Sequence, residues 1–278
     1  MPTTKRVLKQ IRLGICGCGA IGSRIAQSTR IELKKYYRLT ALYDRVRSKT
    51  KHLAQELNDQ TLKKNCLNDL LKSCDLMVEA VNPPAARSVI QQALKHKKNV
   101  LAMSVGRLLH APNLLRLAEK HRCHLLMPSG AVSGIDAVKA ASLKHISKIV
   151  LTTRKPLRGF AGNPYLRRQG ICLDKIQGDT VIFEGPVTEA IKHFPQNINV
   201  AATLALASGH PDQLFIRLLT SPRFTVNSHE IEITGDFGRM ISRTENTICP
   251  DNPKTSYLAV LSAIQTLKDF SDRVHIGT

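Results

Sequence analysis

The sequence contains no tryptophan, and only 4% of its 278 residues are aromatic. Proteins that hold single-stranded nucleic acid stack its bases on aromatic side chains, and few are present here. Acidic residues are also scarce, since 21 Asp and Glu face 41 Lys and Arg, for a formal charge of +20. The basic residues are scattered rather than gathered in a tail. We therefore expect no nucleic-acid partner, and a positive field that steers an anionic substrate and coenzyme to a cleft.

Long apolar runs and paired cysteines are missing as well. No stretch reaches the ~20 apolar residues that span a bilayer, and the first residues lack the apolar core of a secretory signal. We therefore expect a cytoplasmic protein with no membrane partner. None of the seven cysteines lies in a Cys-x-x-Cys pair, so neither a disulfide framework nor a metal site is indicated. Cys16 and Cys18 flank glycines, where small buried side chains are expected and reactive thiols are the alternative.

The first half alternates short apolar runs with helical patterns. This rhythm predicts βαβ units that build a Rossmann-type, doubly wound parallel sheet in a domain over residues 1–130. The expected strands lie at residues 11–15, 39–43, 75–80, 99–103 and 124–127. The expected helices lie at residues 20–31, 48–57, 85–96 and 112–120.

After about residue 130 the rhythm changes, which predicts a second α/β domain over residues 131–250 with a mixed or antiparallel sheet. Its expected strands lie at residues 148–153, 180–184, 214–219 and 226–234, and its helices at residues 186–193 and 200–207. A last helix over residues 256–270, within the segment 251–278, is expected to pack back on the first domain.

A glycine loop follows the first expected strand and opens the first helix. Gly17-Cys18-Gly19-Ala20-Ile21-Gly22 fits the pattern G-x-G-x-x-G. In this context the first glycine permits a tight turn, the second lets the backbone approach a pyrophosphate, and the third lets helix and strand pack closely. The free amides at the helix start attract phosphate. The alternative is a purely structural turn, but strand, loop and helix together predict a dinucleotide site.

An acidic residue stands where this site needs one. Asp44 ends the second expected strand, 22 residues after Gly22, where a carboxylate accepts both ribose hydroxyls. Its charge favours NAD, whereas Arg45 and Arg47 directly after it suit the 2′-phosphate of NADP. The sequence therefore predicts NAD or NADP as the coenzyme and leaves the choice open.

Dehydrogenation also needs a proton acceptor, and ten histidines compete for that role. His229 differs from the others because Glu230 follows it and an alternating strand pattern continues after it. We take it as the candidate base, with a half-exposed strand histidine as the alternative.

The chain resembles the L-aspartate dehydrogenase family along nearly its whole length. The resemblance rests on segments that occur in the family's order: residues 14–22, 78–80, 129–136, 152–156, 194–202, 227–231, 245–246 and 252–256. Among them are Ser-Gly-Ala-Val-Ser-Gly-Ile-Asp, Thr-Thr-Arg-Lys-Pro and Asn-Ser-His-Glu-Ile. The glycine loop is shared with many dehydrogenases, whereas the later segments are more specific.

This resemblance implies a homodimeric enzyme that oxidises L-aspartate to iminoaspartate with NAD or NADP. The imine hydrolyses to oxaloacetate and ammonia, and the family is tied to NAD biosynthesis. The family's active-site histidine falls on His229, and its cofactor contacts in the second half fall on Ala131 and Asn199. An N-cap is an alternative role for Asn199. The second domain is expected to bind substrate and to dimerise.

The two carboxylates of aspartate call for cationic partners. Arg154 and Lys155 are the candidates, with plain surface charge as the alternative for both. Two rival functions remain at this stage. One is a related dehydrogenase acting on another small dicarboxylate or amino acid, and the other is a non-catalytic dinucleotide sensor that binds nucleic acid through its basic surface.

Overall fold

The computed structural model describes residues 10–194, 199–249 and 252–277. The chain divides into two compact units. The first comprises the chain up to Met127 together with Ala263–Val274, and the second comprises Pro128–Ser262 and the residues from His275 onward. Within the described ranges, none of the helices combines the length and hydropathy of a membrane span.

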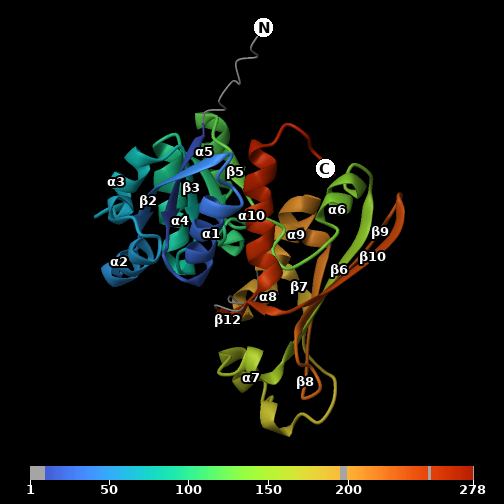
Figure 1. Ribbon diagram of the computed structural model, residues 1–278. Helices are drawn as coiled ribbons and strands as arrows, with labels where there is room; N and C mark the ends of the chain where they lie inside the picture. Colours follow the sequence, from blue (N-terminus) through green and yellow to red (C-terminus); the bar gives the residue numbers. More distant parts are fainter. Residues whose placement is uncertain (1–9, 195–198, 250–251, 278) are drawn as a thin grey trace. The chain divides into compact units, whose positions relative to one another are not determined.

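The first unit is built on a five-stranded parallel sheet with the strand order β2-β1-β3-β4-β5 (Figure 1). Its strands are β1 (Ile11–Cys16), β2 (Tyr37–Tyr43), β3 (Leu76–Glu79), β4 (Asn99–Ala102) and β5 (Leu125–Leu126). Its helices are α1 (Ala20–Ile31), α2 (Arg47–Glu56), α3 (Leu67–Ser73), α4 (Pro83–Lys95) and α5 (Pro112–His121), with short 3-10 turns at η1 (Gln60–Leu62) and η2 (Val105–Arg107). The predicted Rossmann-type fold is confirmed.

The apolar runs of the central strands explain this arrangement. All four residues of β3 are buried, because helices cover both faces of a parallel sheet and leave little room for polar side chains. Lys63, which lies outside the named strands, forms an isolated parallel β-bridge with Leu42 of β2. The helix α3 was not predicted, because its seven residues are too few for a clear helical period.

The C-terminal helix α10 (Tyr257–Ser271) begins in the second unit, and its later residues belong to the first. There the Tyr37 hydroxyl donates to the carbonyl of Leu267 at 2.7 Å, and the ring of His124 lies edge-on to Phe270. These contacts attach the end of the chain to the parallel-sheet unit.

The second unit contains a five-stranded sheet with the order β10-β9-β6-β8-β7 and a small pair, β11 with β12. The strands are β6 (Ile146–Pro156), β7 (Thr180–Pro186), β8 (Leu214–Ser221), β9 (Asn227–Gly235), β10 (Gly238–Asn246), β11 (Ile248–Cys249) and β12 (Asn252–Ser256). The helices are α6 (Ile135–Ala141), α7 (Pro164–Arg168), α8 (Val187–His193) and α9 (Asn199–Ser208) with 3-10 turns η3 (Leu157–Phe160), η4 (Leu173–Lys175) and η5 (Pro211–Gln213). The sheet is mixed, because β6 and β8 run parallel and its other neighbours antiparallel.

Alternation along the strands gives this sheet a buried face and an open face. On β9, His229, Ile231 and Ile233 point to the buried face. On the other face, Phe215 of β8 and Ile241 of β10 are exposed. The division of each strand into these two faces decides which side chains can share a site.

Candidate active site

The glycine loop follows β1 directly, and two of its glycines are required by the packing of the chain itself. Gly17 has φ +102°, and a Cβ there would lie 2.3 Å from the carbonyl oxygen of Ala80. A Cβ on Gly22 would lie 1.9 Å from the carbonyl oxygen of Gly17. Neither position accepts a side chain, so the turn and the close contact of α1 with the strand both depend on glycine.

Gly19 is different, because the chain itself does not require a glycine there. Its φ is −83°, and a Cβ built on it would meet nothing within 4 Å. It lies at the N-cap of α1, whose first turn holds no acidic residue and has no side-chain cap within the described ranges. A pyrophosphate group of a bound ligand therefore fits in the space beside Gly19, where it can accept hydrogen bonds from the amides of Ala20, Ile21 and Gly22.

Asp44 follows β2 and lies beside this loop. Its carboxylate accepts the backbone N–H of Cys18 at 2.9 Å and that of Val46 at 2.8 Å. These bonds hold the carboxylate beside the glycine loop, where an acid contacts the adenosine ribose of a dinucleotide. The side chains of Arg45 and Arg47 are exposed.

Two cysteines accompany the loop. Cys16 and Cys18 are both buried, as predicted. Burial raises the pKa of Cys18 to about 12, and it raises that of Cys16 still further. Because only the thiolate is a good nucleophile, neither thiol is suited to covalent chemistry. Cys66 and Cys172 are the exposed cysteines among the described residues.

In the second unit, His229 lies near the start of β9, between the strands β10 and β6. It is 5% exposed, and its Nδ1 lies 2.9 Å from the Thr153 hydroxyl of the neighbouring strand β6. Burial first, and then the charge of Lys155, lower the pKa of His229 to about 3. The imidazole is therefore neutral at physiological pH, as a proton acceptor must be.

The alternation of β6 separates the two predicted substrate cations. Lys155 lies two residues after Thr153 and so on the His229 face, and burial lowers its pKa to about 8. Arg154 lies on the opposite face, 3.3 Å from the Glu230 carboxylate. The structure thus brings Lys155, but not Arg154, to the histidine.

Ala131 lies near the same face of this sheet. Its carbonyl accepts the Thr244 hydroxyl at 2.9 Å and the Asn246 amide at 3.0 Å, and Thr244 is paired with His229 across the strands β9 and β10. The Oδ1 atom of Asn246 is buried and has no hydrogen-bond partner in the described part of the chain. A buried acceptor of this kind calls for a donor.

Sequence reasoning assigned no role to Thr153 or Asn246, although both lie in segments that carried the family resemblance. Asn199 is the first residue of α9 and is exposed, while residues 195–198 of its predicted segment lie outside the described residues.

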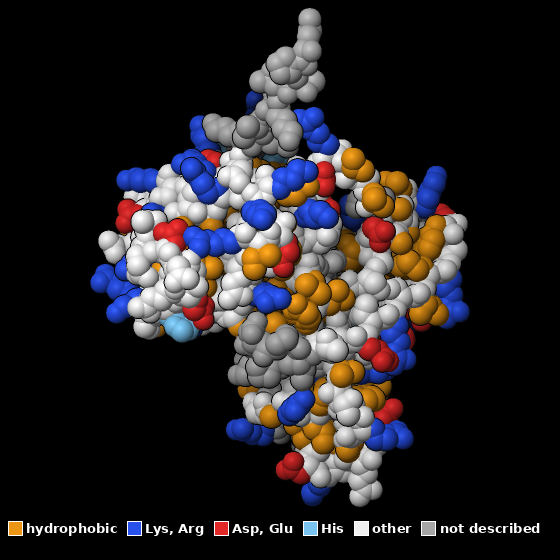
Figure 2. Space-filling view, viewed as in Figure 1, with side chains coloured by type: hydrophobic (Ala, Val, Ile, Leu, Met, Phe, Trp, Pro, Cys, Tyr) orange, Lys and Arg blue, Asp and Glu red, His pale blue; other side chains and the backbone are white. Residues whose placement is uncertain are grey.

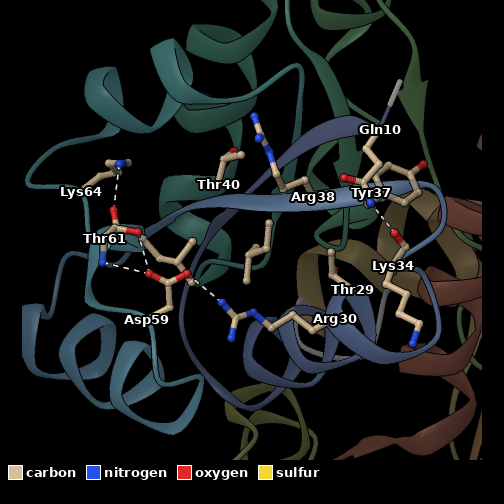
Figure 3. A pocket seen from close by; sticks show the side chains of 12 residues that line it. Gln10, Thr29, Arg30, Lys34, Tyr37, Arg38, Thr40, Asp59, Thr61 and Lys64 are labelled. Carbon is tan, nitrogen blue, oxygen red and sulfur yellow. Dashed lines mark hydrogen bonds and ion pairs between the residues drawn. The ribbon is translucent and has the colours of Figure 1, made fainter. Parts of the chain in front are cut away.

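A cavity of about 570 Å³ in the first unit lies away from the glycine loop (Figure 3). Its lining residues come from the early part of β2, the end of α1 and the segment around η1: Gln10, Thr29, Arg30, Lys34, Tyr37, Arg38, Leu39, Thr40, Asp59, Thr61, Leu62 and Lys64. The ion pair between Arg30 and Asp59 at 2.8 Å crosses it. None of the predicted site residues lines this cavity.

A parallel sheet with a glycine loop at one strand end and an acid at the next defines a dinucleotide-dependent oxidoreductase of the Rossmann class. Two family models match the chain: Homoserine dehydrogenase, NAD binding domain, over residues 17–128, and Aspartate dehydrogenase, C-terminal, over residues 136–270. The chain belongs to the L-aspartate dehydrogenase family.

Curated relatives support this membership, and a solved structure shares the fold. The L-aspartate dehydrogenase of Methanosarcina mazei is 43% identical over 274 residues, which cover 96% of this chain and all of that protein. That of Methanococcus maripaludis is 40% identical over 272 residues, with the same coverage of both chains. The crystal structure of aspartate dehydrogenase from Thermotoga maritima has a TM-score of 0.72 at 22% identity, covering 96% of this chain and all of that one, and so it shares the fold.

Proposed function

We propose that this chain is an NAD(P)-dependent L-aspartate dehydrogenase, which oxidises L-aspartate to iminoaspartate. The imine then hydrolyses to oxaloacetate and ammonia. Family membership over the full length supports this substrate. The structural observation that carries the proposal is a buried, neutral His229 on the same sheet face as a half-buried lysine, Lys155. That pair offers a base for the reacting centre and a cation for a carboxylate.

The coenzyme is NAD or NADP, and the first unit fits it. We assign the pyrophosphate to Gly17, Gly19 and the first-turn residues Ala20, Ile21 and Gly22. Asp44 binds the adenosine ribose, and the exposed Arg45 beside it is proposed to meet a 2′-phosphate. Ala131 and Asn199 are proposed as further coenzyme contacts, on the resemblance described above. The bound nicotinamide supplies the hydride acceptor for the reaction.

His229 acts as the proton acceptor in this proposal. Thr153 holds its Nδ1, which leaves Nε2 for the amine of aspartate or for the water that attacks the imine. Burial is the main cause of the lowered pKa of the histidine, about 3, and the charge of Lys155 lowers it further. A substrate carboxylate that binds Lys155 would offset the charge of the lysine and so raise the pKa of His229. Binding of aspartate would therefore make the histidine a stronger base than it is in the free enzyme.

Lys155 is the substrate cation that the structure favours. A half-buried lysine binds a carboxylate more strongly than an exposed one, because less water competes. Arg154 was predicted as a second clamp, but its position on the open face beside Glu230 supports a structural ion pair instead.

We further propose that the protein is a homodimer formed through the second unit, which also binds the substrate. Ile241, on the edge strand β10, is 55% exposed, and Phe215 on the same open face is 43% exposed. Figure 2 shows hydrophobic side chains gathered over β9 and β10. Exposed apolar side chains on an open sheet face are typical of an interface between subunits. Replacing Ile241 with Asp should yield monomers in analytical ultracentrifugation.

We also propose a place in NAD biosynthesis, which the family resemblance implies because iminoaspartate feeds quinolinate formation. The proposed location is the cytoplasm. The alternatives are a dehydrogenase of another small dicarboxylate or amino acid, and a nucleic-acid-binding sensor. On the face in Figure 2, Lys and Arg are scattered among other side chains rather than gathered in one patch. This pattern favours the enzyme over the sensor.

The test is formation of reduced coenzyme by the purified chain. L-Aspartate and a panel of other amino acids are assayed with NAD and with NADP. Turnover of aspartate well above that of the other amino acids supports the proposal. Turnover of another amino acid well above that of aspartate refutes it. His229→Ala should lower kcat by ~100-fold or more while coenzyme binding is retained, which is the scale of a lost general base. Full activity of that variant would exclude His229 as the base.

A further inference from the structure

A fully buried carboxylate lies at the carboxyl end of β3, outside the residues assigned so far. Glu79 has no exposed surface. Burying a carboxylate is costly unless its oxygens are satisfied, and burial accordingly raises its pKa. A neutral side chain would fill the same space at lower cost. A buried acid at this position therefore needs a specific arrangement of donors.

The donors include three groups from two different strand ends. Oε1 accepts the N–H of Val81 and the hydroxyl of Ser104, both at 3.0 Å, and Oε2 accepts the N–H of Ser104, also at 3.0 Å. Val81 lies in the turn after β3, and Ser104 lies just after β4. One carboxylate thus joins the ends of two adjacent strands.

The glycine loop rests on this same turn. The N–H of Ala80 donates to the carbonyl of Cys16 at 2.8 Å. A Cβ on Gly17 would lie 2.3 Å from the Ala80 oxygen and 2.9 Å from the Val81 nitrogen. The peptide that Glu79 fixes is therefore the surface against which Gly17 packs. Any shift of that peptide must move the loop.

We propose that Glu79 is a positioning residue of the coenzyme site. Its carboxylate holds the Ala80–Val81 peptide and Ser104 in fixed places, and this holds the glycine loop in the shape that receives the pyrophosphate. The inference rests on the proposed coenzyme role of that loop. A preformed loop binds its ligand more tightly, because the loop loses less conformational entropy on binding.

The chemistry requires a carboxylate in particular. All three partners are donors, and a carboxylate is acceptor-only. In Glu79→Gln the amide nitrogen must face the N–H of either Val81 or Ser104, whichever way the side chain is turned. One backbone donor loses its acceptor, and the turn is expected to shift.

The experiment compares Glu79→Gln with a matched control at the other end of the same strand. Asp75 precedes β3, and its carboxylate accepts the backbone N–H of Arg12 at 3.1 Å and the guanidinium at 2.6 Å. Asp75→Asn thus weakens the hydrogen bonds of one carboxylate at the opposite end of β3 from the glycine loop. The dissociation constant of NADH is measured by fluorescence for both variants, under conditions where circular dichroism shows them folded.

We expect Glu79→Gln to raise the dissociation constant of NADH ~10-fold, the effect of one lost buried hydrogen bond. Asp75→Asn should bind NADH like the wild type, even if its melting temperature falls as far as that of Glu79→Gln. With saturating coenzyme, Glu79→Gln should keep kcat within ~3-fold. Wild-type affinity in Glu79→Gln, or equal weakening in both variants, would overturn the inference.

Ser104→Ala provides a second variant if Glu79→Gln does not fold. It removes the hydroxyl donor and keeps the backbone donor, so affinity for NADH should fall by ~3-fold. An unchanged affinity would count against the role of Glu79. Failure of the wild type itself to bind NADH would instead refute the proposed coenzyme site, and the two results are thus distinguishable.

Discussion

Replacing His229 by asparagine should change how the stability of the protein depends on pH. The folded chain holds this histidine with a pKa of about 3, against an ordinary value of 6.5. Below pH 6.5 the unfolded chain takes up a proton that the folded chain does not. Stability is therefore lost as the pH falls through 6.5, and the loss continues to about pH 3, below which it is complete.

The magnitude follows from the size of this shift. Each pH unit in that window costs about 1.4 kcal/mol for one proton. From pH 7.5 to pH 5 the wild type should therefore lose about 2 kcal/mol of unfolding free energy through His229 alone. Asparagine stays neutral and keeps a group that can bond to Thr153. The variant should lose about 2 kcal/mol less than the wild type over the same interval.

Urea unfolding followed by circular dichroism measures this difference, since the chain lacks tryptophan as a fluorescent probe. His145 is exposed and lies in the same unit, so His145→Asn is the matched control and should follow the wild type. If wild type and His229→Asn lose equal stability on acidification, the imidazole is not held neutral by its surroundings. His229 would then not be a neutral base in the free enzyme.

Three further predictions concern binding. Gly19→Ala should leave the melting temperature unchanged but weaken NADH binding ~10-fold or more in calorimetry, because the added methyl meets only the space left for the pyrophosphate. Gly17→Ala, whose methyl collides with Ala80, should instead lower the melting temperature. A lower melting temperature in Gly19→Ala and an unchanged one in Gly17→Ala would refute these roles. Lys155→Met should raise KM for aspartate ~10-fold or more in steady-state assays. Since the lysine pKa is about 8, wild-type KM should rise as the pH passes above 8 and the charge is lost; a ~100-fold fall in kcat with unchanged KM would make Lys155 the base. Asp44→Asn should shift the ratio of kcat/KM values toward NADP by ~10-fold, and an unchanged ratio would remove Asp44 from the ribose site.

The parallel-sheet unit could be predicted from sequence because its signals are local. The apolar strands, the glycine loop and Asp44 lie in one stretch of chain, and each has a sequence pattern of its own. The edge strand β10 was missed because its residues are mostly polar and half exposed, so its identity depends on pairing with β9. Glu79 gave no separate signal, since two of its donors belong to Ser104, 25 residues away at another strand end.

The geometry around His229 could be predicted only in part. The predicted strand ended at residue 153, whereas β6 continues to Pro156. Had it been extended, alternation alone would have placed Arg154 and Lys155 on opposite faces. The contact of Thr153 with His229 depends instead on the register between β6 and β9. That register joins residues 76 positions apart, and no local pattern specifies it.

The distribution of thiols gives the protein built-in attachment points for spectroscopy. Cys66 lies on the surface of the first unit and Cys172 on that of the second, while the cysteines beside the glycine loop are buried and fully protonated at neutral pH. Maleimide dyes should therefore label these two surface positions first, once the half-buried Cys123 is replaced by Ser. A donor and an acceptor attached in this way would report, by energy transfer in single molecules, whether coenzyme draws the two halves of the chain together.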